Sequence, residues 1–321
     1  MPAQGALIRA SDYTDVRKQI SRLLGDKILE FGTDPERATY GYGQTVLSDS
    51  RTVVRTVDLV DDLDLATLRS DLLKVAAHCG VDSNPLITAI PVINQGDLVD
   101  NAHLEAYQAA IPLLNSNRFE LGVGQYSDSV LITSTRSTPW GTTIYYGENT
   151  VRHNFTIDFV TAQKARYFFN SGGQIRFSGS RTGGTTTPQN TSWTDLLSTM
   201  GTVVFNHSST SGASGVGSSI GFYDLTTLGQ QVFIKTSGDA AYTANDYRIL
   251  VSCNVADNTL GEARYVYVSI EFNDDSTANT SILVNDVVTG VLTSNVTVRR
   301  ATGSNVQVDI PNVIPSVELS S

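Results

Sequence analysis

The sequence predicts an α+β protein. A small helical module over residues 1–117 is followed by a larger antiparallel β-sandwich of jelly-roll type over residues 118–321, with one interposed helix. Apolar residues recur at helical spacing before residue 117 and at every second position after it. The second part also has many short apolar runs separated by Gly, Asn and Asp, which are typical of strands and turns. A chain of 321 residues, 40% hydrophobic, can bury a core in each part.

Two amphipathic helices, over 11–25 and 62–80, are expected in the first part. They open with the same pattern of apolar positions and an arginine: Tyr13, Val16, Arg17 and Ile20 in one, Leu65, Leu68, Arg69 and Leu72 in the other. This similarity predicts a packed pair, although two amphipathic helices can also match by chance. We take these eight residues as the candidate surface through which the module docks on other proteins. A third helix is expected over about 100–114.

Residues at the helix ends suggest where the helices begin and stop. Ser11 is expected to cap the first helix, Gly25 to end it in a left-handed conformation and Gly80 to end the second. Four aspartates precede or open the second helix: Asp58, Asp61, Asp62 and Asp64. They could attract a divalent cation, but they lack the glycine and the final glutamate of a calcium loop. Because negative charge is favourable at a helix N-terminus, a capping role is expected and no metal site.

Strict alternation predicts half-buried strands over 151–159, 247–255 and 265–272. In the last of these, Tyr265 and Tyr267 fall on the polar side. Further strands are expected at 142–147, 173–181, 202–206, 219–224, 231–236, 287–298 and 305–310. The interposed helix is expected over 190–201, across one end or face of the sandwich. The extended, proline-spaced C-terminal tail, with Val313 and Ile314, is expected to pair along a neighbour's sheet edge.

Charge and composition exclude several classes of partner. The formal net charge is −10 and the sequence pI is about 4.8, which argues against nucleic acid and anionic membranes. No apolar stretch is long enough to span a bilayer and no signal peptide is found, so we expect a soluble protein that is not conventionally secreted. Cys79 and Cys253 are expected to be buried thiols.

The sequence contains no convincing catalytic or cofactor motif. Its four histidines are not at metal-ligand spacing. Residues 217–221 read Gly-Ser-Ser-Ile-Gly, but a nucleophile elbow needs a strand before it and a helix after it, whereas this match lies in a Ser/Gly run. We therefore expect no catalytic residue, no cofactor and no enzyme. Trp140, Tyr145 and Tyr146 could stack on a sugar ring, although strand aromatics are normally core or cross-strand partners.

Several segments, taken in order, resemble those of poorly characterised structural proteins of tailed bacteriophages, especially contractile-tailed cyanophages. The matching segments are 7–20, 40–45, 65–78, 165–173, 180–184, 192–197, 221–227, 242–245 and 271–275. The resemblance covers most of the chain and is specific for a phage particle protein, but it does not indicate a position in the particle. It offers no catalytic residues to transfer.

The resemblance implies a non-enzymatic virion component, made in the host cytoplasm and associated with the neck, tail or baseplate. Its partners would be other virion proteins and copies of itself. The alternative is a carbohydrate-binding tail-fibre or surface-decoration module that attaches to a host-surface glycan. A fibre shaft is less expected, because neither heptads nor short β-repeats are visible in the sequence.

Overall fold

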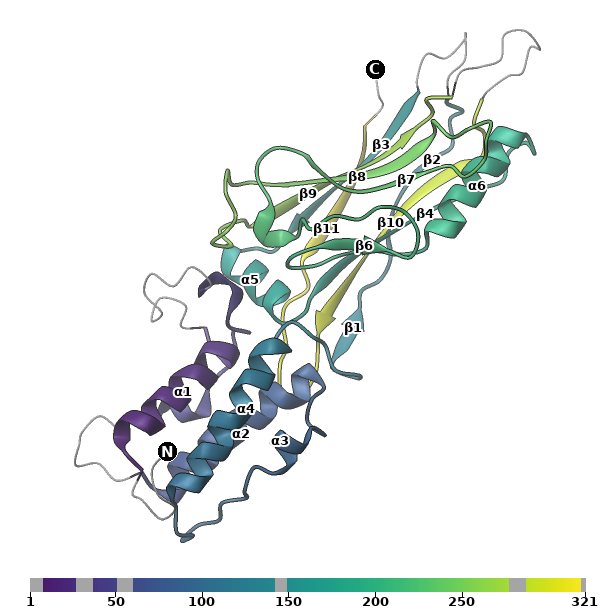
Figure 1. The fold of residues 1–321 in the computed structure, drawn as a ribbon. Helices are drawn as coiled ribbons and strands as arrows, with labels where there is room; N and C mark the ends of the chain where they lie inside the picture. The colour runs from purple at the N-terminus through teal and green to yellow at the C-terminus, as the bar shows by residue number, and fades with distance from the viewer. Residues whose placement is uncertain (1–7, 27–36, 51–59, 142–148, 277–286, 319–321) are drawn as a thin grey trace. The chain divides into compact units, whose positions relative to one another are not determined.

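The computed structural model describes residues 8–26, 37–50, 60–141, 149–276 and 287–318 (Figure 1). Within them the helices are α1 (Ala10–Leu24), α2 (Asp62–Cys79), α3 (Pro85–Thr88), α4 (Asn101–Ser116), α5 (Ala162–Asn170) and α6 (Pro188–Met200). Three 3-10 turns are η2 (Arg37–Thr39), η3 (Leu47–Ser50) and η4 (Phe222–Asp224). The strands are β1 (Tyr126–Asp128), β2 (Ile132–Arg136), β3 (Thr150–Asp158), β4 (Gln174–Thr182), β5 (Val203–Phe205), β6 (Thr210–Gly212), β7 (Gln230–Thr236), β8 (Asp246–Cys253), β9 (Tyr265–Asn273), β10 (Val291–Ala301) and β11 (Asn312–Glu318). The expected α+β class, with N-terminal helices before a β-rich region, is confirmed.

The chain divides into two compact units. Unit 1 consists of Met1–Ser127, Arg166–Gly173 and Arg300–Asp309, and unit 2 of Asp128–Ala165, Gln174–Arg299 and Ile310–Ser321. Unit 1 is therefore built from three separate stretches of chain, two of which come from among or after the strands.

In unit 1, helices α1, α2 and α4 each pack against the other two (Figure 1). Their apolar stripes meet in a common core, in which Tyr13, Val16, Ile20, Leu65, Leu68, Leu72, Leu104, Tyr107 and Leu114 are at most 1% exposed. This is the expected arrangement for helices with one apolar face, because burial of that face supplies most of their stability.

The two expected helix ends behave differently. Gly80 ends α2 in the left-handed conformation, with φ of 72°. Gly25 instead has extended backbone with φ of −82°, because its carbonyl accepts a hydrogen bond from the Gly43 amide of the returning chain. The expected cap at Ser11 is also wrong: α1 begins at Ala10, and its N-cap, Arg9, makes no side-chain capping bond.

Residues 166–173 anchor the loop around Tyr42 inside unit 1. The buried Asn170 amide donates hydrogen bonds to the carbonyls of Ala38 and Tyr40, at 3.0 and 2.9 Å. The ring of Tyr167 lies against Gly43, where a Cβ atom would come within 2.4 Å of it. Tyr42 itself is buried, and its hydroxyl donates to the Arg118 carbonyl at 2.6 Å.

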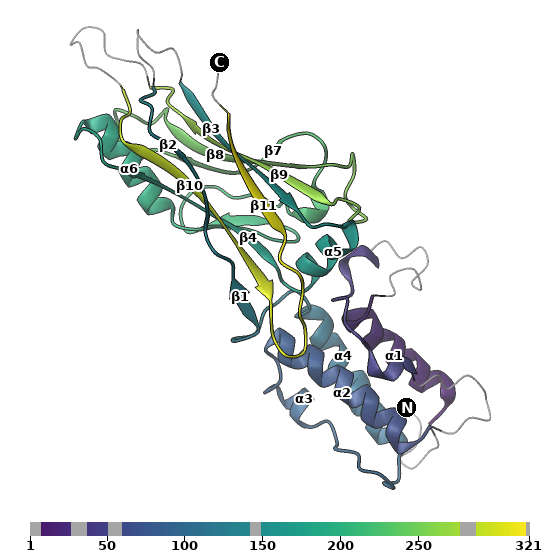
Figure 2. The ribbon, with the colours of Figure 1, turned by 180° about the vertical axis from the view of Figure 1, so that it is seen from behind.

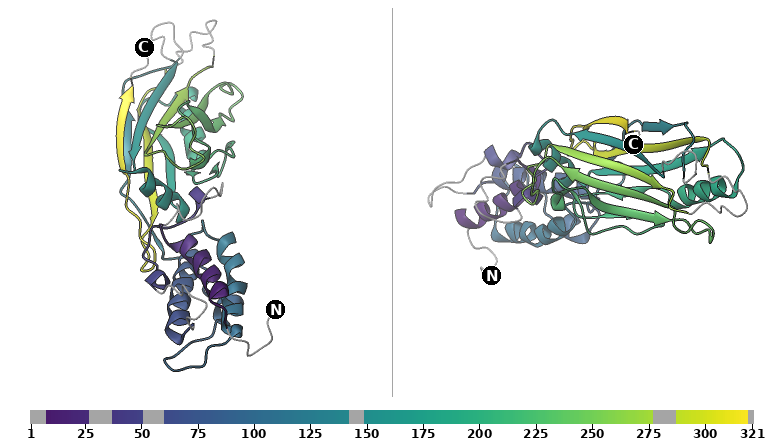
Figure 3. Two further views of the ribbon diagram at one scale, coloured as in Figure 1. Left: turned by 90° about the vertical axis from the view of Figure 1, so that its left-hand side faces the viewer. Right: turned by 90° about the horizontal axis from the view of Figure 1, so that it is seen from above.

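Unit 2 consists of two antiparallel sheets (Figures 1 and 3). Sheet A has the order β1-β10-β4-β5-β6, with β2 also paired to β10, and sheet C has the order β11-β3-β9-β8-β7. The two face each other, since the His153 ring of β3 bonds to the Ser294 hydroxyl of β10 at 2.9 Å. In both sheets, strands that are not consecutive in the sequence lie next to each other, as is typical of a β-sandwich.

Helix α6 contributes to the interior of this sandwich. Its apolar side chains Trp193, Leu196, Leu197 and Met200 are at most 3% exposed. Trp193 packs on Phe272 of β9 with ring centroids 6.0 Å apart, and Leu197 lies against Gly179 of β4. The helix therefore contacts residues of both sheets, and Gly179 leaves the space that Leu197 fills.

Several strand predictions are corrected by the structure. The segment expected as a strand at 219–224 forms turn η4, and 305–310 makes only an isolated bridge at Gln307. The segment 142–147 lies outside the described residues. Strands β1, β2 and β6, and the second helix among the strands, α5, were not predicted. The other expected strands are present within a few residues of their predicted bounds.

The C-terminal segment pairs within its own chain: β11 adds antiparallel to β3 at one edge of sheet C (Figure 2). Strand β2, at an edge of sheet A, lies beside it and runs in the same direction. The described residues of the tail are therefore already part of a sheet, without a neighbouring molecule.

The register of β3 determines which of its backbone N–H and C=O groups bond to β9 and which bond to β11. The Phe159 amide donates to the Arg264 carbonyl, and the Asn149 carbonyl accepts from the Asp274 amide. Odd-numbered residues of the β3 ladder thus bond to β9. In an antiparallel ladder both backbone groups of a residue point the same way, so even-numbered residues of β3 bond to β11.

On β11 the same rule places Pro315 at the free edge. Ile314 pairs with Thr156, so its backbone groups point toward β3. Those of Val313 and Pro315 point outward. Because proline has no N–H, the outer edge of β11 lacks a hydrogen-bond donor at its centre. The missing donor disfavours pairing with another strand.

Candidate functional site

The residues expected to dock on partners lie mostly in the core of unit 1. Six of the eight helical positions are fully buried: Tyr13, Val16, Ile20, Leu65, Leu68 and Leu72. Arg17 forms an ion pair with Asp49, whose carboxylate oxygen is 3.2 Å away. Arg69 is half-buried beside Tyr107. The apolar stripes hold the unit together, so in this conformation they offer no surface to a partner.

The two candidate residues of the C-terminal segment are different. Ile314 is 57% exposed and Val313 is half-buried. Of the predicted interaction residues, the apolar helical set is therefore buried, Val313 is half-buried and Ile314 is accessible.

The aromatic residues proposed for sugar stacking are not brought together at a surface. Trp140 is 2% exposed and packs against Trp193, with ring centroids 5.1 Å apart. Tyr145 and Tyr146 lie outside the described residues. Because a stacking residue must present a ring face to solvent, Trp140 cannot serve that role here.

Two of the four aspartates at the start of α2, Asp61 and Asp64, cap the helix. Asp61 accepts the Asp64 amide at 2.8 Å, and Asp64 in turn accepts the Asp61 amide at 3.0 Å. Asp62 accepts the Gly96 amide, and Asp58 lies outside the described residues. Asp61 and Asp62 border a cavity of about 390 Å³. Among the residues that the structure describes, no three His, Cys, Asp or Glu side chains are grouped to hold a metal ion.

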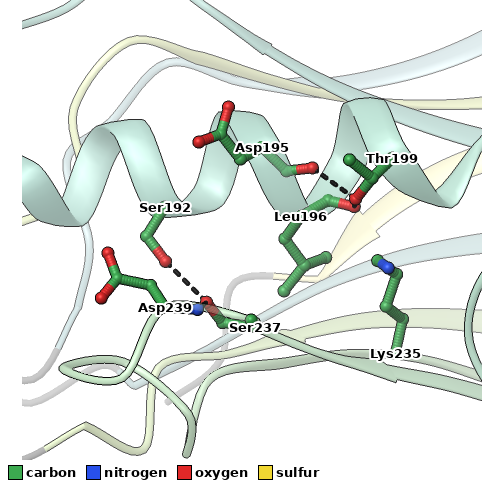
Figure 4. A pocket seen from close by; sticks show the side chains of 8 residues that line it. Ser192, Asp195, Leu196, Thr199, Lys235, Ser237 and Asp239 are labelled. Carbon is green, nitrogen blue, oxygen red and sulfur yellow. Dashed lines mark hydrogen bonds between the residues drawn. The ribbon is translucent and has the colours of Figure 1, made fainter.

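A second cavity, of about 410 Å³, lies between α6 and the end of β7 in unit 2 (Figure 4). The hydroxyls of Ser192 and Ser237 point toward one another there and bond at 2.7 Å. Lys235, which also lines the cavity, donates to the Ser214 hydroxyl at 2.6 Å. The lining includes two carboxylates and no histidine, and the two serine hydroxyls bond to one another and not to either carboxylate. The cavity can hydrogen-bond a small polar molecule.

The Gly217–Gly221 motif has the wrong surroundings for a nucleophile. Ser218 forms an isolated bridge with Thr210, Ser219 is exposed, and the motif leads into η4. A nucleophile elbow requires the serine on a tight turn between a strand and a helix, with a histidine in reach. That arrangement is not found around Ser219.

Two buried histidines and a buried thiol are in their uncharged forms at neutral pH. Burial, together with the nearby Arg136 guanidinium, lowers the pKa of His153 to about 4. Burial also lowers the pKa of His78 to about 4 and raises that of the Cys79 thiol to about 11. Cys79 and Cys253 are free and buried, as expected. An uncharged, buried thiol or imidazole is typical of a core residue and not of a reactive one.

The outer face of sheet C carries a pair of tyrosines, Tyr265 and Tyr267, that were not among the site residues predicted from the sequence. Tyr267 is 40% exposed and its ring lies nearly parallel to that of Tyr265, with centroids 6.2 Å apart. In the sequence, the feature that could have identified them is their position on the polar side of a strand in which apolar and polar residues alternate. A large aromatic ring on that side has no core to enter, so it is a better candidate for binding than Trp140.

No protein-family model, no curated protein and no solved structure matches this chain. Among the described residues, no helix is both long enough and apolar enough to cross a bilayer.

Proposed function

We propose that this chain is a non-enzymatic structural component of a tailed-phage particle, associated with the neck, tail or baseplate. It would assemble through contacts with other virion proteins and with copies of itself. The resemblance of its segments to phage structural proteins supports the proposal, as does the absence of an assembled catalytic group around the motifs and cavities described above.

The observation that carries the proposal is a set of exposed aliphatic side chains where the two sheet edges meet. We call this set the β2–β11 edge; it consists of Val130, Leu131, Ile310 and Ile314, which are 83%, 51%, 45% and 57% exposed. Val130 and Leu131 immediately precede β2, and the two isoleucines lie just before and within β11, beside it. Exposed aliphatic clusters of this kind mark protein–protein contacts.

Contact at this edge would use side chains and not strand addition. The free edge of β11 lacks an amide at Pro315, whereas Ile314 projects from the outer face of the sheet, as Thr156 beside it does. A partner would therefore cover the aliphatic side chains of the edge without extending the sheet. This replaces the expectation that the tail pairs along a neighbour's sheet.

Mass spectrometry of purified particles of the encoding phage tests the proposal. We expect the chain among the virion proteins at a fixed copy number. Its absence from the particles would overturn the assignment.

A second experiment tests the surface. Leu131→Asp combined with Ile314→Asp should lower incorporation into particles by at least about tenfold, because buried charge without a partner is costly at an interface. The matched control is Leu228→Asp, which alters a 75% exposed leucine before β7, at the opposite edge of sheet C. Equal incorporation of both variants would exclude the β2–β11 edge as the contact.

A further inference from the structure

The central strands of sheet C form a regular, solvent-facing surface. Strands β3, β9 and β8 pair without register shifts. Alternation sends Val266 and Val268 into the sandwich and Tyr265 and Tyr267 outward. The two tyrosine rings are within 9° of parallel. Sheet C thus presents two similarly oriented rings along one strand.

This tyrosine pair is held in place by its neighbours. The Arg264 guanidinium lies over the ring of Tyr265, 4.6 Å from its centroid. The same guanidinium donates two hydrogen bonds to the Asp158 carboxylate, both at 2.8 Å. Bidentate bonds of this kind fix the arginine, and the arginine in turn limits the movement of Tyr265. A ring that is already ordered loses less entropy when a ligand binds.

Short, uncharged polar side chains surround the exposed ring. Tyr267 pairs with Thr156 on one side and Ser252 on the other. In the next row Ser269 lies beside Asn154. All four are half-buried, with hydroxyl or amide groups that can donate and accept hydrogen bonds.

The charged groups at the two ends of this surface are paired with one another. At one end Arg264 is bonded to Asp158. At the other, the Arg152 guanidinium bonds to the Glu271 carboxylate at 2.7 Å. The centre is therefore neutral, in a chain whose net charge of −10 opposes binding of anionic polymers.

We propose that Tyr265 and Tyr267, with the polar residues around them, form a binding platform for a neutral glycan. A pyranose ring has an apolar C–H face that packs on an aromatic ring, and a rim of hydroxyls that bond to hydroxyl and amide side chains. The platform offers both kinds of group side by side, without an unpaired charge among the residues named. This goes beyond the proposed structural role, because it concerns what the chain binds outside its assembly.

The test is binding of the full-length chain, displayed multivalently, to a printed array of neutral and acidic glycans, followed by calorimetric titration with the best neutral oligosaccharide. Tyr267→Ala should raise Kd by at least about tenfold, which corresponds to about 1.4 kcal/mol. Tyr267→Phe keeps the ring and should stay within about threefold of the original Kd. The control Tyr126→Ala removes a half-buried tyrosine from β1, outside this surface, and should leave Kd unchanged.

A second variant guards against a loss of binding that merely reflects misfolding. Ser269→Arg places a bulky cation on the outer face beside the rings and should abolish binding while the thermal midpoint stays near its original value. A blank array, binding to acidic glycans alone, or an unchanged Kd in Tyr267→Ala would each overturn the proposal. None of these outcomes bears on whether the chain is present in virions, so the two proposals can fail independently.

Discussion

Two fully buried histidines make the stability of this protein sensitive to acid. His153 lies between the two sheets of unit 2, where its Nδ1 atom is 2.9 Å from the Ser294 hydroxyl. His78 lies in unit 1, with its ring centroid 4.8 Å from that of Tyr42. Burial lowers the pKa of each to about 4, because a charged imidazolium would lose its hydration.

We expect the free energy of unfolding to fall between pH 7 and pH 5. The unfolded chain, with a histidine pKa near 6.5, binds the proton more readily than the folded one. The stabilisation from the neutral rings is therefore complete above pH 6.5 and is lost as the pH falls toward 4. Between pH 7 and pH 5, each histidine should lower the free energy of unfolding by about 2 kcal/mol, which urea denaturation can measure.

His153→Asn isolates one of these groups, because an amide can still bond to Ser294 but does not titrate in this range. The variant should lose about half of the histidine-dependent change between pH 7 and pH 5. The same pH dependence in variant and parent would show that His153 is accessible to protons in the folded state.

At the scale of elements, β11 is an edge strand of sheet C whose outer side carries a proline. Its outward backbone groups are those of Val313 and Pro315, as the register with β3 requires. A proline in this position removes a donor that a second strand would need.

Pro315→Val should restore that donor and promote self-association. We expect the weight-average mass, measured by light scattering after gel filtration, to rise more steeply with protein concentration than in the parent chain. Ser316→Val is the control, since the Ser316 amide already points toward β3. If the two variants behave alike, the free edge of β11 is protected by something other than the proline.

The elements that could be predicted are those with one buried face. Strand β3 was expected over 151–159 and is found at Thr150–Asp158, because a half-buried strand must alternate. Helix α5 was missed because it has only nine residues, too few for a helical repeat to stand out, and it ends in the aromatic run Tyr167–Phe169, which also suits a strand. The segment at 219–224 has strand composition, but a tight turn that closes at Asp224 determines its conformation.

The candidate site was harder to predict than the fold. Periodicity identifies which side chains are buried, but not whether they are buried within the chain or against a partner. The stripe containing Val16 and Leu68 was therefore assigned to docking, although it packs internally. Tyr267 was visible as an aromatic on the polar side of its strand, but its alignment with Tyr265 depends on the fixed position of Arg264, which only coordinates reveal.

At the scale of the whole molecule, unit 1 depends on segments distant in sequence. Asn170 supplies hydrogen bonds to backbone carbonyls in the Ala38–Gly41 stretch, and Gly172 packs closely on the Phe119 carbonyl. Gln44 bonds to the Gln307 carbonyl at 2.9 Å. Without these partners, buried carbonyls and apolar surface would be left uncovered.

A fragment of residues 1–127 should therefore fail to fold cooperatively, although it contains α1, α2 and α4. We expect reduced helical circular dichroism and a broad thermal transition, whereas the full chain should give a sharp one. In the full chain Asn170→Ala should lower the free energy of unfolding by about 2–3 kcal/mol. A fragment that unfolds sharply would show that the later segments are dispensable.

Because unit 1 is built from three separate segments of the chain, recombination within the gene would affect its packing. A single crossover near residue 127 would pair a foreign helical part with the resident Arg166–Gly173 and Arg300–Asp309 segments. The mismatch would fall on Tyr167 against Gly43, where no Cβ fits. We therefore expect recombination to transfer the whole gene. Related sequences should then differ by point substitutions more often than by exchange of the N-terminal or C-terminal part.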